Sequence, residues 1–144
     1  MIYFDTSALL KKYVKEEIGH RKVVDALAKN PQHLVASVLT RLELIAALTR
    51  RRKEIPEYEK VVRAFNDDWE VFIAWSIDDD LLVATEAIIL KHGLRAADAI
   101  HLATALNVKK HTKDHLLFMS SDAELLKAAN TEGLLVSDPT MQTT

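Results

Sequence analysis

The sequence predicts an α/β fold, a three-layer α/β/α sandwich around a central, mostly parallel sheet of about five short strands. The expected strands are short runs that are apolar throughout, as is typical of strands covered on both faces. They alternate with longer stretches of helical periodicity, which favours parallel strands joined by helical crossovers. Only three glycines and three prolines interrupt the chain, and the glycines lie beside helical patterns, where turns belong.

The chain begins with an apolar run over residues 2–4 that stops at Asp5. A helical pattern follows at once, and Thr6 or Ser7 is the expected N-cap because a hydroxyl can accept from a free amide of the first turn. Residues 20–29 form a second amphipathic pattern that ends before a proline. A strand and two helices are therefore expected before residue 30.

The next elements follow the same alternation. Residues 34–36 are apolar and predict the second strand, after which Ser37 can cap a helix. That helix ends in four cations at residues 50–53, which suit the negative end of a helix dipole. Pro56 suits the first turn of the helix that comes next.

The second half of the chain completes the sandwich. At 144 residues the chain has the length of one domain, which we place at residues 1–138, with residues 139–144 as a loose tail. The remaining elements are strands over 71–75, 116–119 and 134–136, and helices over 78–92, 95–107 and 121–131.

Composition excludes several classes of protein. Hydrophobic residues make up 49% and charged residues 28%, so disorder is excluded as the main state. Cysteine is absent, which excludes disulfides and thiolate chemistry and fits a reducing compartment. The net charge of −2 gives no global positive field for nucleic acid. No signal peptide or membrane span is visible, so a cytoplasmic location is expected.

Polar residues follow the expected strands at their carboxyl ends, where open α/β sheets place their sites. Asp5 follows the first strand, Ser120 and Asp122 follow the fourth, and Asp138 follows the fifth. Any one of these residues alone is more simply explained as a helix cap or a turn residue.

Two further acids lie within helices of apolar character. Glu43 has leucine, threonine and alanine neighbours at helical spacing, and Asp98 lies in a helix that is apolar almost all round. A buried carboxylate must be paired, protonated or bound to metal. The simpler explanation for Asp98 is an ion pair with Arg95, and His101 is also one turn away.

Together these residues suggest a metal site. Carboxylates that share a water-accessible cleft repel one another, and a hard divalent cation such as Mg²⁺ or Mn²⁺ relieves this. The candidates come from four separate segments, and the hydroxyls of Ser7 and Ser120 could orient them; the acids are Asp5, Glu43, Asp98 and Asp122.

Four segments resemble the motifs of PIN-domain proteins, in the family's order and in the matching strand or helix context. They are residues 2–9, 39–44, 95–105 and 119–126, and the resemblance extends over residues 1–138. The length and the first motif look most like the VapC-type toxins of toxin–antitoxin pairs. Where the family often has threonine, this chain has Ser120, which keeps the hydroxyl.

The resemblance implies a metal-dependent endoribonuclease, inhibited by a small antitoxin protein, that forms a homodimer. It assigns the acidic site to the same four carboxylates, with Asp122 as the least certain direct ligand, and the supporting hydroxyls to Ser7 and Ser120. Apolar residues over 61–75 support the homodimer. The RNA target and the number of metal ions stay open.

Other interpretations compete with this one. A phospho-aspartate phosphatase would need a second aspartate at position 7, where this chain has serine. A non-catalytic interaction module with the same fold remains the main alternative, although such a module would be expected to lose at least one acid. His101 is interpreted as a satisfied helix residue or ion-pair partner, and the basic clusters 50–53 and 109–115 as solvated surface or a phosphate-binding rim.

Overall fold

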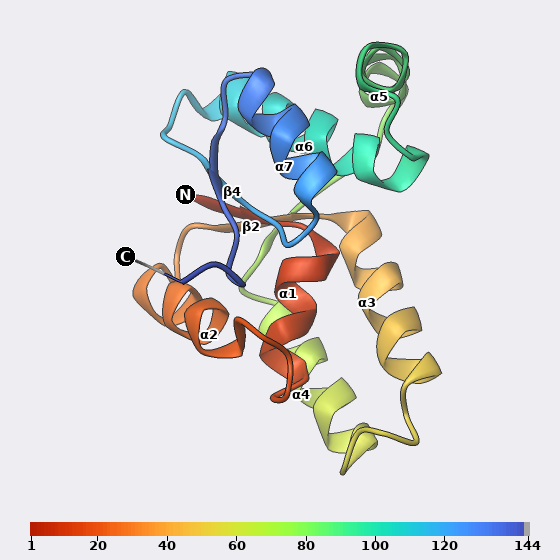
Figure 1. The fold of residues 1–144 in the computed structure, drawn as a ribbon, viewed down its shortest axis with the longest axis vertical. Helices are drawn as coiled ribbons and strands as arrows, with labels where there is room; N and C mark the ends of the chain where they lie inside the picture. Colours follow the sequence, from red (N-terminus) through yellow and green to blue (C-terminus); the bar gives the residue numbers. More distant parts are fainter. Residues whose placement is uncertain (143–144) are drawn as a thin grey trace.

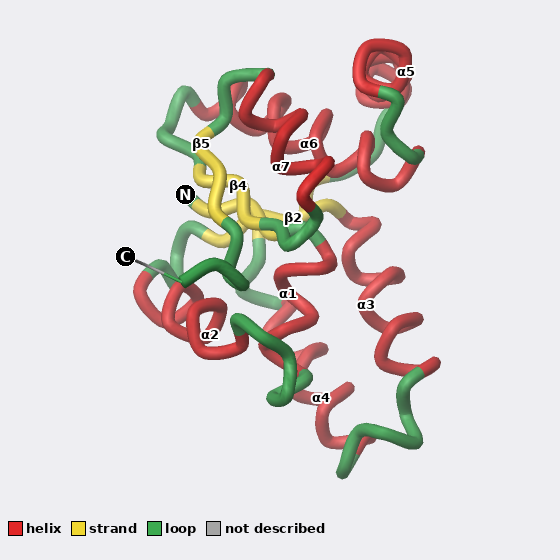
Figure 2. Tube along the Cα trace, viewed as in Figure 1, coloured by secondary structure: helices red, strands yellow, loops and turns green. Residues whose placement is uncertain are grey.

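Within residues 1–142, the part of the chain that the computed structural model describes, five parallel strands form the centre of the molecule. They lie in the order β3-β2-β1-β4-β5 and appear in yellow in Figure 2. Their bounds are β1 (Ile2–Phe4), β2 (Leu34–Ser37), β3 (Ile73–Trp75), β4 (Leu117–Met119) and β5 (Leu135–Ser137). The predicted sheet is confirmed, and all of its described pairings are parallel.

Helices cover both faces of this sheet (Figure 1). One layer holds α1 (Thr6–Tyr13), α2 (His20–Lys29), α3 (Val38–Arg50) and α4 (Tyr58–Trp69). The other holds α5 (Asp79–His92), α6 (Ala96–Thr112) and α7 (Ala123–Thr131). The three-layer sandwich is therefore confirmed.

The three central strands, β1, β2 and β4, send alternate side chains into two separate cores. In β1, Tyr3 faces the core beneath α5–α7 and stacks on Phe118 at a centroid distance of 5.4 Å. Ile2 and Phe4 face the opposite core, beneath α1–α4. Strands buried on both faces need apolar residues at every position, which explains why these segments show no alternation of polar and apolar residues.

Several elements begin or end a few residues away from the prediction, and three of these differences have a clear physical cause. The N-cap of α1 is Asp5, and neither Thr6 nor Ser7, because a carboxylate oxygen of Asp5 accepts from the amide of Ala8 at 2.9 Å. Pro56 lies before α4, because Glu57 has a left-handed backbone (φ 55°) that delays the helix to Tyr58. Helix α6 continues past Asn107 to Thr112, because Val108 still packs into the core.

The order of the strands creates the place for a site. From β1 the chain adds β2 and β3 on one side of the sheet, and later β4 and β5 on the other. The carboxyl ends of β1 and β4 therefore lie side by side at the point where strand order reverses, with Phe4 paired to Met119. Such a reversal opens a crevice at the carboxyl edge of a parallel sheet.

The described part of the C-terminal segment is held in place at its start. Thr140 donates its amide and its hydroxyl to the side chain of Asp138. Gly19, with φ of 96°, lies so close to Pro139 that a side chain at position 19 would clash with its carbonyl. The last two residues of the predicted tail, 143 and 144, lie outside the described residues. No helix over residues 1–142 is long and apolar enough to cross a membrane.

Candidate acidic site

Asp5 lies at the carboxyl end of β1 and is only 3% exposed. Its carboxylate accepts from the hydroxyls of Ser7 and Ser120 at 2.8 Å each and from the amide of Ala8. Burial raises the pKa of Asp5, while the charge of His101 and the three donors lower it, and burial prevails. A carboxylate offers about four acceptor positions, so these three donors leave room for one more ligand.

The serines beside Asp5 form a small hydroxyl cluster that joins β1 to β4. The hydroxyl of Ser120 accepts from the amide of Asp122 at 3.0 Å, and that of Ser7 accepts from the amide of Ser121 at 3.0 Å. Both hydroxyls therefore hold Asp5 and fix the turn after β4, in agreement with the supporting role expected of them.

Glu43 reaches the same region from α3 and is held by donors from two other elements. Its Oε1 atom accepts from the hydroxyl of Thr6 at 2.7 Å and lies 2.7 Å from Nε2 of His101. Burial raises the pKa of Glu43, but the hydrogen bonds from His101 and Thr6 outweigh burial and hold that pKa below its ordinary range. Glu43 is therefore an ionised carboxylate with its side chain 31% exposed.

Asp98 lies in the first turn of α6 and pairs only loosely with a cation. The Nε atom of Arg95 is 3.8 Å away, and the side chain of Arg95 is 86% exposed against 24% for Asp98. Burial and then the negative charge of Asp122 raise the pKa of Asp98, and Glu43 adds to this. The expected ion pair with Arg95 is thus weak, and Asp98 is governed by the acids around it.

Asp122 is the N-cap of α7, where its side chain accepts from the amide of Leu125 at 3.0 Å. The simpler explanation of Asp122 as a helix cap is therefore correct, and the cap uses its Oδ1 atom. Its charge still acts on Asp98.

The four predicted acids share one region, linked by short bonds or by charge. The hydroxyl of Ser120 donates to the carboxylate of Asp5 and accepts from the backbone amide of Asp122. The charges of Asp122 and Glu43 both act on Asp98. Over residues 1–142, however, no three acidic or histidine side chains already converge on one metal-sized point. The arrangement is a group of carboxylate oxygens with net negative charge, which suits a hard divalent cation.

The sequence did not single out Thr6 and Tyr3 as site residues, although both contact it. Tyr3 hydrogen-bonds to Nδ1 of His101 at 2.8 Å, and Thr6 donates to Glu43. The interpretation of His101 as a satisfied ion-pair partner is confirmed, but its partner is Glu43 and not Asp98. Two features of the sequence could have pointed to these residues. Tyr3 carries a hydroxyl in a run of otherwise apolar residues, and Thr6 places a hydroxyl at the first position of α1.

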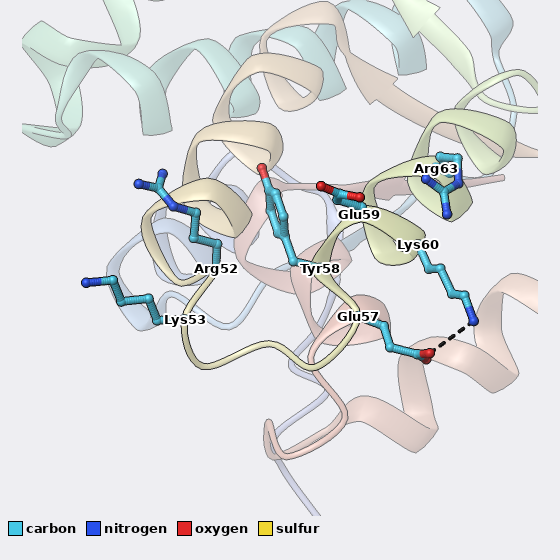
Figure 3. Close-up of a pocket in the computed structure, with 7 residues that line it drawn as sticks. All are labelled: Arg52, Lys53, Glu57, Tyr58, Glu59, Lys60 and Arg63. Carbon is cyan, nitrogen blue, oxygen red and sulfur yellow. Dashed lines mark hydrogen bonds and ion pairs between the residues drawn. The ribbon is translucent and has the colours of Figure 1, made fainter.

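The two basic clusters lie away from the acids. Cations of the first cluster line a cavity of about 540 Å³ with residues of α4: Arg52, Lys53, Glu57, Tyr58, Glu59, Lys60 and Arg63 (Figure 3). Helix α3 ends at Arg50, seven residues or roughly 10 Å along its axis beyond Glu43, and Arg52 follows that end. The second cluster ends α6 and precedes β4, which places it at the opposite edge of the sheet from the acids.

Comparison with protein families gives a match to the PIN domain over residues 2–131. The chain is also similar to curated relatives named Ribonuclease VapC45 and Ribonuclease VapC49, from two strains of Mycobacterium tuberculosis. Each is 32% identical over 112 residues, which cover 75% of this chain and 76% of the relative.

Solved structures share the fold at lower identity. VapC20 of Mycobacterium tuberculosis, described as a Sarcin–Ricin loop cleaving toxin, matches with a TM-score of 0.69 at 16% identity, over 94% of this chain and 97% of VapC20. DNA-bound VapBC of Salmonella typhimurium matches with a TM-score of 0.67 at 12% identity, over 96% and 97%.

Proposed function

The chain belongs to the PIN-domain family, and we propose that it is an endoribonuclease of the VapC type, the toxin of a toxin–antitoxin pair, which hydrolyses phosphodiester bonds of RNA. The observation that carries this proposal is the set of four acids from separate segments at one edge of the sheet, in a chain 32% identical to proteins named ribonucleases.

The proposed cofactor is Mg²⁺ or Mn²⁺, held by Asp5, Glu43, Asp98 and Asp122, with Asp122 either as a ligand or through water. The donor set supports this, because all four groups offer oxygen and because burial and the charges of Asp122 and Glu43 keep the pKa of Asp98 raised despite Arg95 and His101. When bound, such a cation lowers the pKa of a bound water and stabilises the charge that develops on the phosphate.

The residues of the chain prepare the site for this chemistry. Ser7 and Ser120 hold Asp5 in one orientation, so its remaining acceptor position faces a fixed direction. Thr6 and His101 do the same for Glu43. An RNA phosphate carries negative charge, so the acids alone would repel it, and the cationic cavity between α3 and α4 is the candidate rim for more distant phosphates.

An antitoxin partner and a homodimer belong to the same proposal. Several solved neighbours are toxin–antitoxin complexes, among them one from Klebsiella pneumoniae. The apolar residues over 61–75 that first suggested a dimer mostly pack into the core, as Phe65 does. Val71 and Ile73 of this segment are exposed, however, and so are three apolar side chains of α5: Leu82, Val83 and Leu90. Sedimentation that gave only monomer at high micromolar concentration would contradict the homodimer.

The test is cleavage of total bacterial RNA by the purified chain with Mn²⁺, with excess EDTA, and with the Asp98→Asn variant. Asp114→Asn, purified in the same way, is the matched control because Asp114 is exposed at the opposite edge of the sheet. We expect cleavage with wild type and Asp114→Asn in Mn²⁺ only. Equal cleavage by Asp98→Asn would indicate a contaminating nuclease, and no cleavage by any sample would favour the non-catalytic alternative.

The proposed place of action is the cytoplasm, where RNA substrates are available. The absence of cysteine fits that reducing compartment.

A further inference from the structure

A chain of hydrogen bonds crosses the sandwich above the edge of the sheet. It starts at Tyr3 on β1, passes through His101 on α6 and ends at Glu43 on α3, with spacings of 2.8 and 2.7 Å. Helices α6 and α3 belong to opposite layers of the fold. These two hydrogen bonds therefore join the two layers at the acidic site.

The chemistry of the three groups determines which atom donates the hydrogen bond to Glu43. A carboxylate at neutral pH only accepts, so Nε2 of His101, 2.7 Å from Oε1 of Glu43, carries the proton between them. The hydroxyl of Tyr3 lies 2.8 Å from Nδ1 on the other side of the ring, and a hydroxyl can donate or accept there. Both ring nitrogens therefore have a partner, and this fixes the plane of the ring.

The result is a Glu43 carboxylate with two unlike oxygens. Oε1 accepts from both Thr6 and His101, which occupies both of its lone pairs. Among residues 1–142, no donor is hydrogen-bonded to Oε2. The donors thus fix the rotation of the carboxylate and leave one oxygen free.

We propose that His101, set in place by Tyr3, is a positioning residue that turns Glu43 so that only Oε2 is left free to serve as a metal ligand, through one oxygen. This inference rests on the proposed function, because it takes Glu43 to be one of the metal-binding acids. The imidazole of His101 is 3% exposed and hydrogen-bonds to Glu43, so it acts through Glu43.

The side chains around the ring exclude a simple packing role. His101 lies among apolar neighbours of α6, and a leucine would fill that space at lower desolvation cost if only packing mattered. Both ring nitrogens instead have a partner at hydrogen-bond distance. Partners of this kind behind a ligand typically change metal affinity by about 10–100-fold when removed.

The test uses Mn²⁺ binding to the metal-free, full-length chain, measured by isothermal titration calorimetry. His101→Leu removes the donor to Glu43 and should weaken Mn²⁺ binding by about 10–100-fold. His101→Gln keeps an N–H donor near the position of Nε2 and should recover most of the affinity. A purely structural role for the ring would not separate these two variants by affinity once both are folded.

Two tyrosine variants supply a matched pair. Tyr3→Phe removes the hydroxyl that orients His101, and it should weaken Mn²⁺ binding by less than His101→Leu does. Tyr13→Phe removes a similarly buried hydroxyl that donates to Asp68 at 2.7 Å, away from the acids, and should leave binding unchanged. If circular dichroism shows that His101→Leu is unfolded, the comparison of Tyr3→Phe with Tyr13→Phe decides.

The outcomes separate the inference from the function on which it rests. Wild type that binds Mn²⁺, with His101→Leu or Tyr3→Phe binding equally well, would overturn the positioning role and leave the proposed metal site intact. Wild type that binds no Mn²⁺ would overturn both. Weakened binding in Tyr3→Phe but not in Tyr13→Phe, with recovery in His101→Gln, supports the inference.

Discussion

Replacing Asp98 with asparagine distinguishes a metal ligand from a structural ion-pair partner. The amide has the shape of the carboxylate but lacks its charge. The cation that pairs with Asp98 within 4 Å among residues 1–142 is Arg95, 3.8 Å away and 86% exposed, and His101 acts on Asp98 only through its charge. The neighbouring acids Asp122 and Glu43 act in the opposite sense and disfavour the charge of Asp98.

The expected change in metal-free stability is small. An exposed ion pair of this kind contributes about 0–1 kcal/mol, and the loss of repulsion offsets it. For a chain of this size that corresponds to a shift in melting temperature of about 3 °C or less. With Mn²⁺ at a hundred times its Kd, wild type should gain about 2.7 kcal/mol, or roughly 8 °C, and the variant much less.

The pH dependence has a definite sign. Because the pKa of Asp98 is raised in the folded protein, the folded state binds this proton more tightly than the unfolded state does. The group therefore lowers metal-free stability as pH rises from the unfolded pKa of about 3.9 through the higher folded pKa. Asp98→Asn should lack that decline.

Differential scanning fluorimetry with and without Mn²⁺, at several pH values, provides the measurement, with Asp114→Asn as the control. If Asp98 were half of a buried ion pair, its loss would cost about 3–5 kcal/mol, and the metal-free variant would melt more than about 10 °C early. Early melting of that size, with no stabilisation of wild type by Mn²⁺, would refute the assignment of Asp98 as a ligand.

Three further changes test the structure around the site by urea denaturation. Ser120→Ala removes a fully buried hydroxyl that donates to Asp5, and should lower the free energy of unfolding by about 1–3 kcal/mol; an unchanged midpoint would contradict the hydroxyl cluster. Phe65→Ala empties a fully buried core position and should cost about 3–5 kcal/mol, whereas a loss below about 1 kcal/mol would contradict the packing. The hydrogen bond from Arg51 lowers the pKa of Glu17 in the folded protein. Glu17 therefore stabilises the fold at pH values above its unfolded pKa, and this stabilisation is lost as the pH falls through the folded pKa. Glu17→Gln should therefore cost about 0–1 kcal/mol at pH 7 and nothing at strongly acidic pH, and a difference that persists in acid would contradict the pair.

The layers and the sheet could be predicted from the sequence because each element has a local signal. Apolar runs such as residues 34–36 need no partner to be recognised as buried strands, and Ser37 caps α3 as expected, through the amide of Leu39. The failures occurred where two local signals competed. Asp5 and two hydroxyls could each cap α1, and the carboxylate does so because β1 aims it at the first turn.

The acids of the site could be chosen from the sequence, but their partners could not. The rule that sites form at the carboxyl edge selects Asp5 and Asp122, and unusual acids within apolar helices select Glu43 and Asp98. Pairing depends on distance in space. His101 is three residues from Asp98 along α6, yet the crossing of helices from two layers places it against Glu43, 58 residues away.

These contacts divide the acidic site into a fixed half and a charged half. Asp5 and Glu43 are each held by two or more donors, so their orientations are set before any ligand arrives. Asp98 has no such donor within residues 1–142, and its raised pKa reflects burial and the charge of Asp122. A cation that enters between the halves would find oriented oxygens on one side and relieve repulsion on the other. The fixed half would then determine geometry, and the charged half would supply much of the gain on binding, which is why Asp98→Asn should act mainly on the strength of Mn²⁺ binding and His101→Leu through the orientation of Glu43.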